Sequence, residues 1–377
     1  MAAAENNQTS GLSLEHHEIT LPTAGNVHVY VQGTRASNEV VILTVHDLGC
    51  NYTMYLDFVE HPKMRPVRDK TVWVHVNVPG QEPDAPDLPD GFQFPKMQVI
   101  SEELINILDH LKIKEVVCFG EGAGANILAR FAIAHNQRVM GVCLLHATGT
   151  AAGFMESIKD KVQNWKLDQV GMNPKAEAYL VLHRYGTSKE TVVFEEAVSR
   201  EFSNAEDKEQ VRSAIENYQS NLRTHTNAKN LKRFVEGFLK RTNYYEGLKK
   251  IKCPVLLVTG QKSVFRGTTA SLHHHLVKVT DDKGAVEFIE IKDVANVLEE
   301  KPEKLVESFQ YFLQGLGLVS SVPMHHINKA GLRNRSMSME EYDMPNKLRT
   351  RSISGGSGEQ SPIQENPAEG VNSTCKK

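Results

Sequence analysis

Hydrophobic and polar positions follow one another along the chain in blocks, and the blocks predict strands that alternate with helices. Positions 16–21 and 26–32 alternate with a period of two, which predicts an initial hairpin. Continuous apolar runs, typical of strands buried on both faces, lie at 40–45, 71–78, 115–119, 139–145, 254–259 and 285–291. Helical stretches separate or follow them at about 96–111, 123–134, 268–279 and 303–313. We therefore expect an α/β fold with a mainly parallel central sheet that helices cover on both faces.

Two parts of the chain break this alternation. Between about 151 and 247, helical stretches follow one another without a strand run, which is typical of an all-helical cap inserted between the strands of a sheet. From 319 to 377, Ser, Gly, Pro, Asn and charged residues replace the apolar periodicity, as in a disordered tail. We expect a flexible N-terminus at 1–15, a domain at 16–318 that includes the cap, and a disordered tail that contains Ser and Arg.

Composition narrows the classes of function. The chain is 40% hydrophobic and 24% charged, as in ordinary globular proteins, and its net charge of −3 favours no nucleic-acid partner and does not indicate contact with a membrane surface. The first ten residues lack the basic start and apolar core of a signal peptide, and no apolar run approaches the roughly 18 residues of a membrane span. Five scattered cysteines without a C-x-x-C pair favour reduced thiols. We expect a cytoplasmic protein.

A strand, a glycine turn and a helix between Glu115 and His135 match the frame of the nucleophile elbow of α/β hydrolases, G-x-S-x-G. The frame here is Gly-Glu-Gly-Ala-Gly, and Gly122 stands in the place of the serine. Glycine has no side chain that could attack a substrate. The pattern therefore favours an α/β-hydrolase fold and speaks against its usual chemistry.

Glycine-rich turns also bind phosphate groups of cofactors. The dinucleotide fingerprint G-x-G-x-x-G needs a third glycine where Ala125 stands, and its turn normally follows the first strand. No Gly-Lys-Ser/Thr follows, which excludes a P-loop. We therefore expect no cofactor.

The other two positions of a hydrolase triad lack the required residue types. The acid should follow the strand at 254–259, where the nearest candidate position holds Ser263. The histidine should precede the last helix, where Asn296 stands. Since Gly122 also lacks a nucleophile, we expect no triad hydrolysis.

Polar residues still surround the predicted pocket: His46 and Asp47 after one strand, Glu121 in the elbow, and His146 after another strand. In one interpretation they cap strand ends and bond to loop backbone. In the other, Asp47 orients His146 in an altered acid–base site. The run of three histidines at 273–275 is not expected to bind metal, because adjacent residues on a helix point in different directions.

Four stretches in order resemble the N-myc downstream-regulated gene (NDRG) family. They are the glycine elbow, His46-Asp-Leu-Gly-Cys-Asn-Tyr52, Val74-His-Val-Asn-Val-Pro-Gly80 with Gly91-Phe-Gln-Phe-Pro95, and Phe309-Gln-Tyr-Phe-Leu-Gln-Gly-Leu-Gly317. The resemblance implies an α/β-hydrolase fold without hydrolase activity, in cytoplasmic proteins of differentiation, growth and stress signalling with phosphorylated tails. We expect a signalling adaptor with protein partners of signalling or trafficking type. The alternatives are a residual or altered hydrolase, and a module that binds a lipid or small molecule under the cap.

The tail carries the pattern Arg-x-Arg-x-x-Ser twice, ending at Ser338 and at Ser354. Paired arginines at this spacing can meet carboxylates in the cleft of a basophilic Ser/Thr kinase. We therefore expect phosphorylation of both serines, with Ser336 and Ser352 as secondary sites.

Overall fold

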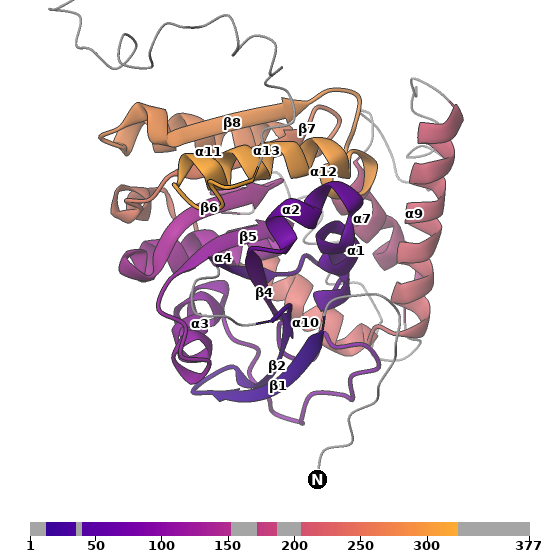
Figure 1. Cartoon of the computed structure of the whole chain (residues 1–377). Coiled ribbons are helices and arrows are strands. Elements are labelled where there is room, and N and C mark those ends of the chain that lie inside the picture. The colour runs from indigo at the N-terminus through magenta and orange to yellow at the C-terminus, as the bar shows by residue number, and fades with distance from the viewer. Residues whose placement is uncertain (1–12, 35–39, 152–171, 187–204, 323–377) are drawn as a thin grey trace, which may run out of the picture. The chain divides into compact units, whose positions relative to one another are not determined.

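The computed structural model describes residues 13–34, 40–151, 172–186 and 205–322. Eight strands of this part form one sheet in the order β1-β2-β4-β3-β5-β6-β7-β8 (Figure 1). Strands β1 and β2 pair antiparallel and β2 pairs antiparallel with β4, whereas the remaining neighbours are parallel. The expected mainly parallel sheet is confirmed. The strands are β1 Leu14–Leu21, β2 Gly25–Gln32, β3 Val40–Val45, β4 Thr71–Val76, β5 Val116–Glu121, β6 Val139–Leu145, β7 Val255–Gly260 and β8 Val286–Ile291.

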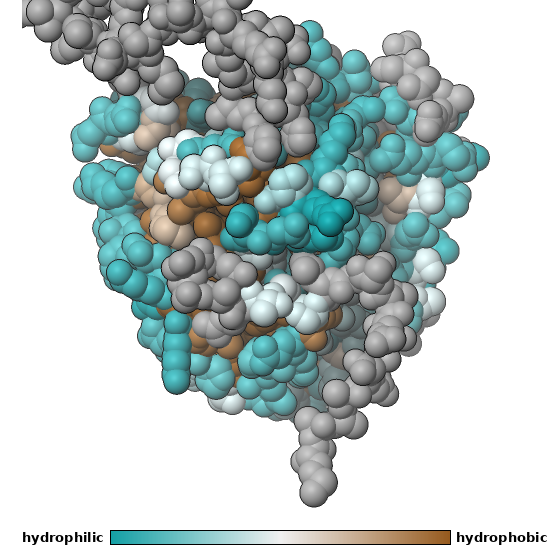
Figure 2. All heavy atoms as spheres, viewed as in Figure 1, coloured by the Kyte–Doolittle hydropathy of each residue, from teal (hydrophilic) through white to brown (hydrophobic). Residues whose placement is uncertain are grey.

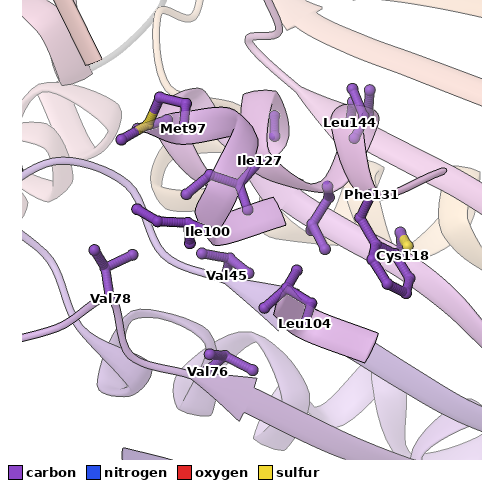
Figure 3. Packing of buried hydrophobic residues seen from close by; sticks show 14 of the residues in the cluster. Val45, Val76, Val78, Met97, Ile100, Leu104, Cys118, Ile127, Phe131 and Leu144 are labelled. Carbon is purple, nitrogen blue, oxygen red and sulfur yellow. The ribbon is translucent and has the colours of Figure 1, made fainter. Parts of the chain in front are cut away.

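One face of the sheet packs on α3 and α4, because successive strand residues point to opposite faces. Val45, Cys118 and Leu144 from the strands lie in one buried cluster with residues of the two helices. Figure 3 shows this packing, in which Leu104 of α3 and Phe131 of α4 lie against the strand residues. The helices of this face are α3 Met97–His110, α4 Gly122–Ala134 and α11 Arg266–Val279.

The opposite face holds a second cluster, built around aromatic rings. The ring of Phe119 lies 5.5 Å from that of Trp73, 4.9 Å from that of Phe309 and 5.3 Å from that of Phe58 between centroids. Aromatic pairs at these separations stabilise a core beyond the area that they bury. The helices of this face are α1 Leu56–Glu60, α2 Arg65–Arg68, α12 Val297–Glu300 and α13 Pro302–Gly315.

Three helices of the predicted cap are described: α7 Pro174–Tyr185, α9 Ala205–Thr224 and α10 Ala228–Leu239. Figure 1 shows α9 as a long helix along one side. The cap contacts the sheet loops by hydrogen bonds, since the hydroxyl of Tyr218 donates to the carbonyl of Leu48 over 2.9 Å and the amide of Asn230 donates to the carbonyl of Gly80 over 3.1 Å. The parts of the predicted cap at 152–171 and 187–204 lie outside the described residues.

Element ends differ from the expected ones where polar contacts compete with the ladder. Strand β4 ends at Val76 and not at position 78, because the N–H of Val78 donates to the ring of His46 over 3.0 Å. The chain also stays packed beyond α13: Val322 is buried, and its carbonyl accepts a hydrogen bond from the amide of Gln314 over 2.6 Å. The body that can be tested alone therefore extends at least to position 322.

The face of the molecule in Figure 2 is mostly hydrophilic, and its hydrophobic residues gather where α13 and β6 lie in Figure 1. Within the described ranges, no helix is long and apolar enough to cross a membrane.

Candidate functional site at the elbow

The elbow has the backbone geometry of a sharp strand-to-helix turn. Gly122 follows β5 directly with a φ of +55°, a region that disfavours residues with a side chain. Two positions on, a Cβ at Gly124 would lie 1.9 Å from the carbonyl oxygen of Val45. Glycine at both positions lets α4 start close against β3.

The carboxylate of Asp47 occupies the space beside Gly122. A Cβ at position 122 would lie 2.2 Å from its Oδ1 and 2.4 Å from its Oδ2. Oδ1 accepts a hydrogen bond from the N–H of Ala123 over 2.7 Å, at the start of α4. The place into which a nucleophile would project is therefore filled by a carboxylate that caps the helix.

His183, on cap helix α7, holds Asp47 from the other side. Its Nε2 lies 3.0 Å from both carboxylate oxygens and, since a carboxylate only accepts, Nε2 carries the proton. Both side chains are almost fully buried. Burial alone would raise the pKa of Asp47, but His183, the N–H of Ala123 and Arg184 together hold that pKa below its usual value.

The suggested pairing of Asp47 with His146 is wrong. His146 has a φ of +51°, and its Nε2 accepts from the N–H of Val297 over 3.2 Å. Its Nδ1 lies 3.0 Å from the hydroxyl of Ser263. Burial lowers the pKa of His146 to about 3, so the ring is neutral and connects two loops.

Glu121 and Asn296 contact one another. The amide of Asn296 donates to Oε1 of Glu121 over 2.5 Å, and its own Oδ1 accepts from the N–H of Glu299 at the start of α12. Burial raises the pKa of Glu121 to about 7, with Arg184 opposing this rise at 3.6 Å and Asp47 adding to it. Asn296 therefore caps a helix and holds a carboxylate.

Arg184, next to His183 on α7, completes the cluster. It donates to Glu299 over 2.5 Å and to the sulfur of Cys50 over 3.1 Å, and its guanidinium lies over the ring of Tyr218 at 5.5 Å. A cavity of about 440 Å³ lies beside it. Desolvation alone would lower the pKa of Arg184, but Cys50, Glu121 and other acidic neighbours hold it well above its usual value.

Sequence reasoning missed both His183 and Arg184. The available signal was a pair of polar residues inside the otherwise apolar stretch of α7, Ala-Tyr-Leu-Val-Leu-His-Arg-Tyr. By contrast, His46 lies where it was expected. Its Nδ1 bonds to the carbonyl of Asp47 and its Nε2 accepts from Val78, so this ring holds loop backbone together, and burial lowers its pKa to about 4.

The run of three histidines contributes to packing on α11. His275 stacks on Tyr245 with 4.0 Å between ring centroids, and His273 stacks on Phe288 at 5.3 Å. Within the described part of the chain, no group of three His, Cys, Asp or Glu residues is arranged to hold a metal ion. The four serines expected to be phosphorylated, at 336, 338, 352 and 354, lie outside that part.

The amino-acid sequence is similar to a known protein family and to individual proteins of other organisms. The model of the Ndr family matches residues 16–320. The uncharacterized protein ZK1073.1 of Caenorhabditis elegans is 35% identical over 328 residues, which are 86% of this chain and 91% of that protein. Protein NDRG3 of Xenopus tropicalis is 26% identical over 325 residues, 83% of this chain and 76% of its own length.

Solved structures give the fold. A thermophilic esterase from Thermogutta terrifontis superposes with a TM-score of 0.60 at 16% identity, over 80% of this chain and 99% of that one. MGS-M2, an α/β hydrolase enzyme from a deep-sea metagenome library of the Medee basin, has a TM-score of 0.59 at 15% identity, over 77% and 94%. Identities this low show the α/β-hydrolase fold and nothing of the chemistry.

Proposed function

Because the chain belongs to the Ndr family, we propose that it is a non-enzymatic α/β-hydrolase-fold protein that acts in cytoplasmic signalling by presenting its surfaces to protein partners. The observation that supports this proposal is the position of Asp47. Its carboxylate lies 2.2 Å from the place of a Cβ at position 122, so neither a serine side chain nor a substrate carbonyl has room at the elbow.

The residues at the other two triad positions, Ser263 and Asn296, make hydrogen bonds that hold the fold together. Ser263 bonds to the ring of His146 and accepts from the N–H of Phe265 over 3.2 Å. Asn296 caps α12 and donates to Glu121. A serine hydroxyl at the elbow would need an adjacent base, and neither the hydroxyl of Ser263 nor the amide of Asn296 is one.

The proposal includes regulation through the tail. Phosphorylation of Ser338 and Ser354 by a basophilic kinase, with Ser336 and Ser352 as secondary sites, would add about −1.5 to −2 charge at each site beside two arginines. One phosphate would cancel most of the positive charge of the two arginines beside it, and binding that depends on the basic runs would weaken. Phosphopeptide mapping under growth-factor stimulation and under stress tests this, and unmodified peptides in every condition would refute it.

The main experiment measures turnover of a panel of acyl esters and epoxides by the full chain, by Asp47→Asn and by the control Asp90→Asn, whose side chain is exposed. We expect no turnover above buffer for any of the three. Turnover by wild type and Asp90→Asn that is lost in Asp47→Asn would show an enzyme. Affinity purification with the full chain and with residues 1–322 then shows which partners need the tail.

A second candidate function has one observation in its favour. Asp47 and His183 form a carboxylate–imidazole pair at 3.0 Å, the arrangement in which a carboxylate orients a general base. Both are sealed between cap and sheet, and the Nδ1 of His183 has no hydrogen-bond partner among the described residues. The same panel tests this altered hydrolase, with His183→Gln as the variant that would abolish turnover.

A further inference from the structure

A second cavity, of about 490 Å³, opens between the start of α3, the middle of α4 and the end of α10. Its charged lining is one carboxylate and five cations, namely Glu236, Lys96, Arg130, Arg233, Lys240 and Arg241. Glu236 already pairs with Lys240 over 3.2 Å. Since the chain as a whole has a net charge of −3, the local excess of positive charge is a feature of this place and not of the composition.

Arg130 is 2% exposed and has no counter-charge in the described part of the chain. Its guanidinium donates only to neutral oxygens: Oδ1 of Asn126 over 2.9 Å, Oε1 of Gln98 over 2.9 Å, and the hydroxyl and carbonyl oxygens of Thr242. It also lies over the ring of Tyr244 at 5.1 Å. Burying a charge without a partner is costly, and burial lowers the pKa of Arg130.

Arg241 repeats this situation in the same cavity wall. It is 6% exposed, and it donates to the carbonyl of Thr150 over 3.1 Å and to that of Phe238 over 3.0 Å. Burial lowers its pKa to about 10, although nearby tyrosines oppose this, and Arg130 adds to the decrease. Two neighbouring buried guanidinium groups thus face a cavity with only neutral acceptors around them.

The rest of the lining suits an anion with an apolar body. Phe92, Phe94 and Met97 form an apolar wall. Helix α3 begins here, its N-cap Lys96 provides no side-chain cap, and the free N–H groups of a helix start favour negative charge. Nη1 of Arg233 is buried without a hydrogen-bond partner in the described ranges.

We infer that this cavity binds a soluble organic phosphate monoester. A doubly charged phosphate has enough oxygens to accept hydrogen bonds from the guanidinium groups of Arg130 and Arg241 and from the backbone N–H groups at the start of α3. The organic part lies against the phenylalanine wall, and the volume suits a ligand of the size that protein pockets usually hold. The inference does not depend on the adaptor role proposed above, because the elbow residues are not part of this lining.

The experiment titrates 1-naphthyl phosphate into the full chain by isothermal calorimetry. We expect saturable binding that is at least tenfold weaker in Arg241→Gln and in wild type with inorganic phosphate as ligand. The matched control is Arg65→Gln on α2, whose side chain is 76% exposed and lies on the other face of the sheet. It should bind as wild type does.

Two further measurements, with the variant Arg233→Gln and with lipid vesicles, complete the test. Arg233→Gln changes a half-buried residue, and it should weaken binding at least threefold. This result counts even if circular dichroism finds Arg241→Gln to be unfolded. Absence of binding to wild type at roughly 1 mM ligand, or unchanged binding in the folded variants, overturns the inference. Flotation with phosphatidate vesicles distinguishes a lipid head group: co-flotation that requires Arg233 or Arg241 would reject a soluble ester.

Discussion

Two clusters of buried charge lie along helix α4, about two turns apart, and they differ in how the charge is balanced. At the start of the helix, Asp47 meets His183 and a backbone N–H, and Glu121 lies near Arg184 and accepts from Asn296. At Arg130, the guanidinium has only neutral acceptors and opens onto a cavity.

This difference in charge balance indicates a different role for each cluster. A charge that its neighbours compensate holds elements together, here the cap to the elbow. A charge that is buried without compensation destabilises the fold unless something else supplies the opposite charge, and functional sites often carry that cost. The elbow, where α/β hydrolases carry their nucleophile, is here a structural contact. The cavity beside Arg130 and Arg241 is the place to look for a ligand.

The largest effect is expected from Asp47→Ala. The change leaves Nε2 of His183 and the N–H of Ala123 buried without an acceptor. We expect a loss of about 3–5 kcal/mol in the free energy of unfolding, measured by urea denaturation. The exposed Asp90→Ala should change it by less than about 0.5 kcal/mol, and an equal small effect in both variants would show that the elbow is not a structural contact.

Gly122→Ser comes next. The positive φ costs roughly 1 kcal/mol and the contact with Asp47 adds about 1–3 kcal/mol, without any gain of ester hydrolysis. In the Asp47→Ala background the contact is gone, so the same substitution should cost only roughly 1 kcal/mol. Additive losses in a double-mutant cycle would contradict this explanation, and new hydrolysis of activated esters would reveal a base near the elbow.

Glu121→Gln tests the charge balance through pH. Burial raises the pKa of Glu121 from 4.5 to about 7, so the folded state holds a proton that the unfolded state has lost in this interval. The stability that this proton contributes is present below pH 4.5 and is lost as the pH rises towards 7. Between pH 4.5 and 7, the free energy of unfolding of Glu121→Gln should rise relative to that of wild type by up to about 1.4 kcal/mol per pH unit. Above pH 7 this difference should stay constant.

The measurement is urea denaturation at pH 5, 6, 7 and 8. Glu287→Gln, an exposed carboxylate on β8, serves as the control and should show no such trend. A flat difference between Glu121→Gln and wild type would mean that Arg184 and Asn296 keep the carboxylate ionised throughout.

The smallest effect is expected from Arg241→Met, and it contrasts the two clusters directly. Removing an uncompensated buried charge also removes its desolvation cost, so stability should change by less than about 1 kcal/mol. Arg184→Met removes a compensated arginine and leaves Glu121 and Glu299 unpaired, which should cost about 3 kcal/mol or more. The free energy of unfolding of both variants is measured by thermal or urea denaturation. Equal losses of stability would show that the two clusters do not differ in charge balance.

Local pattern was sufficient for most elements of the fold. The apolar runs and their glycine turn predicted β5 and α4 within two residues, because buried strands and amphipathic helices leave a periodicity in the sequence. Helix α2 was missed because a four-residue helix has too few positions for a period. Helix α9 lies within the stretch predicted as an all-helical cap, where the pattern indicated helices without fixing their ends.

By itself, the sequence determined the strand–helix order and the residue types at the elbow, since each depends on neighbours in the chain. The contact of Asp47 with His183, 136 positions away, and the meeting of Arg130 with Arg241 were decided only by the tertiary structure. Both pairs are too far apart in the sequence for a helix or strand periodicity to predict their contact. The cap brings them together, because its helices bury apolar residues in the same cluster as the sheet. His183 lies on α7, and Arg241 follows the end of α10.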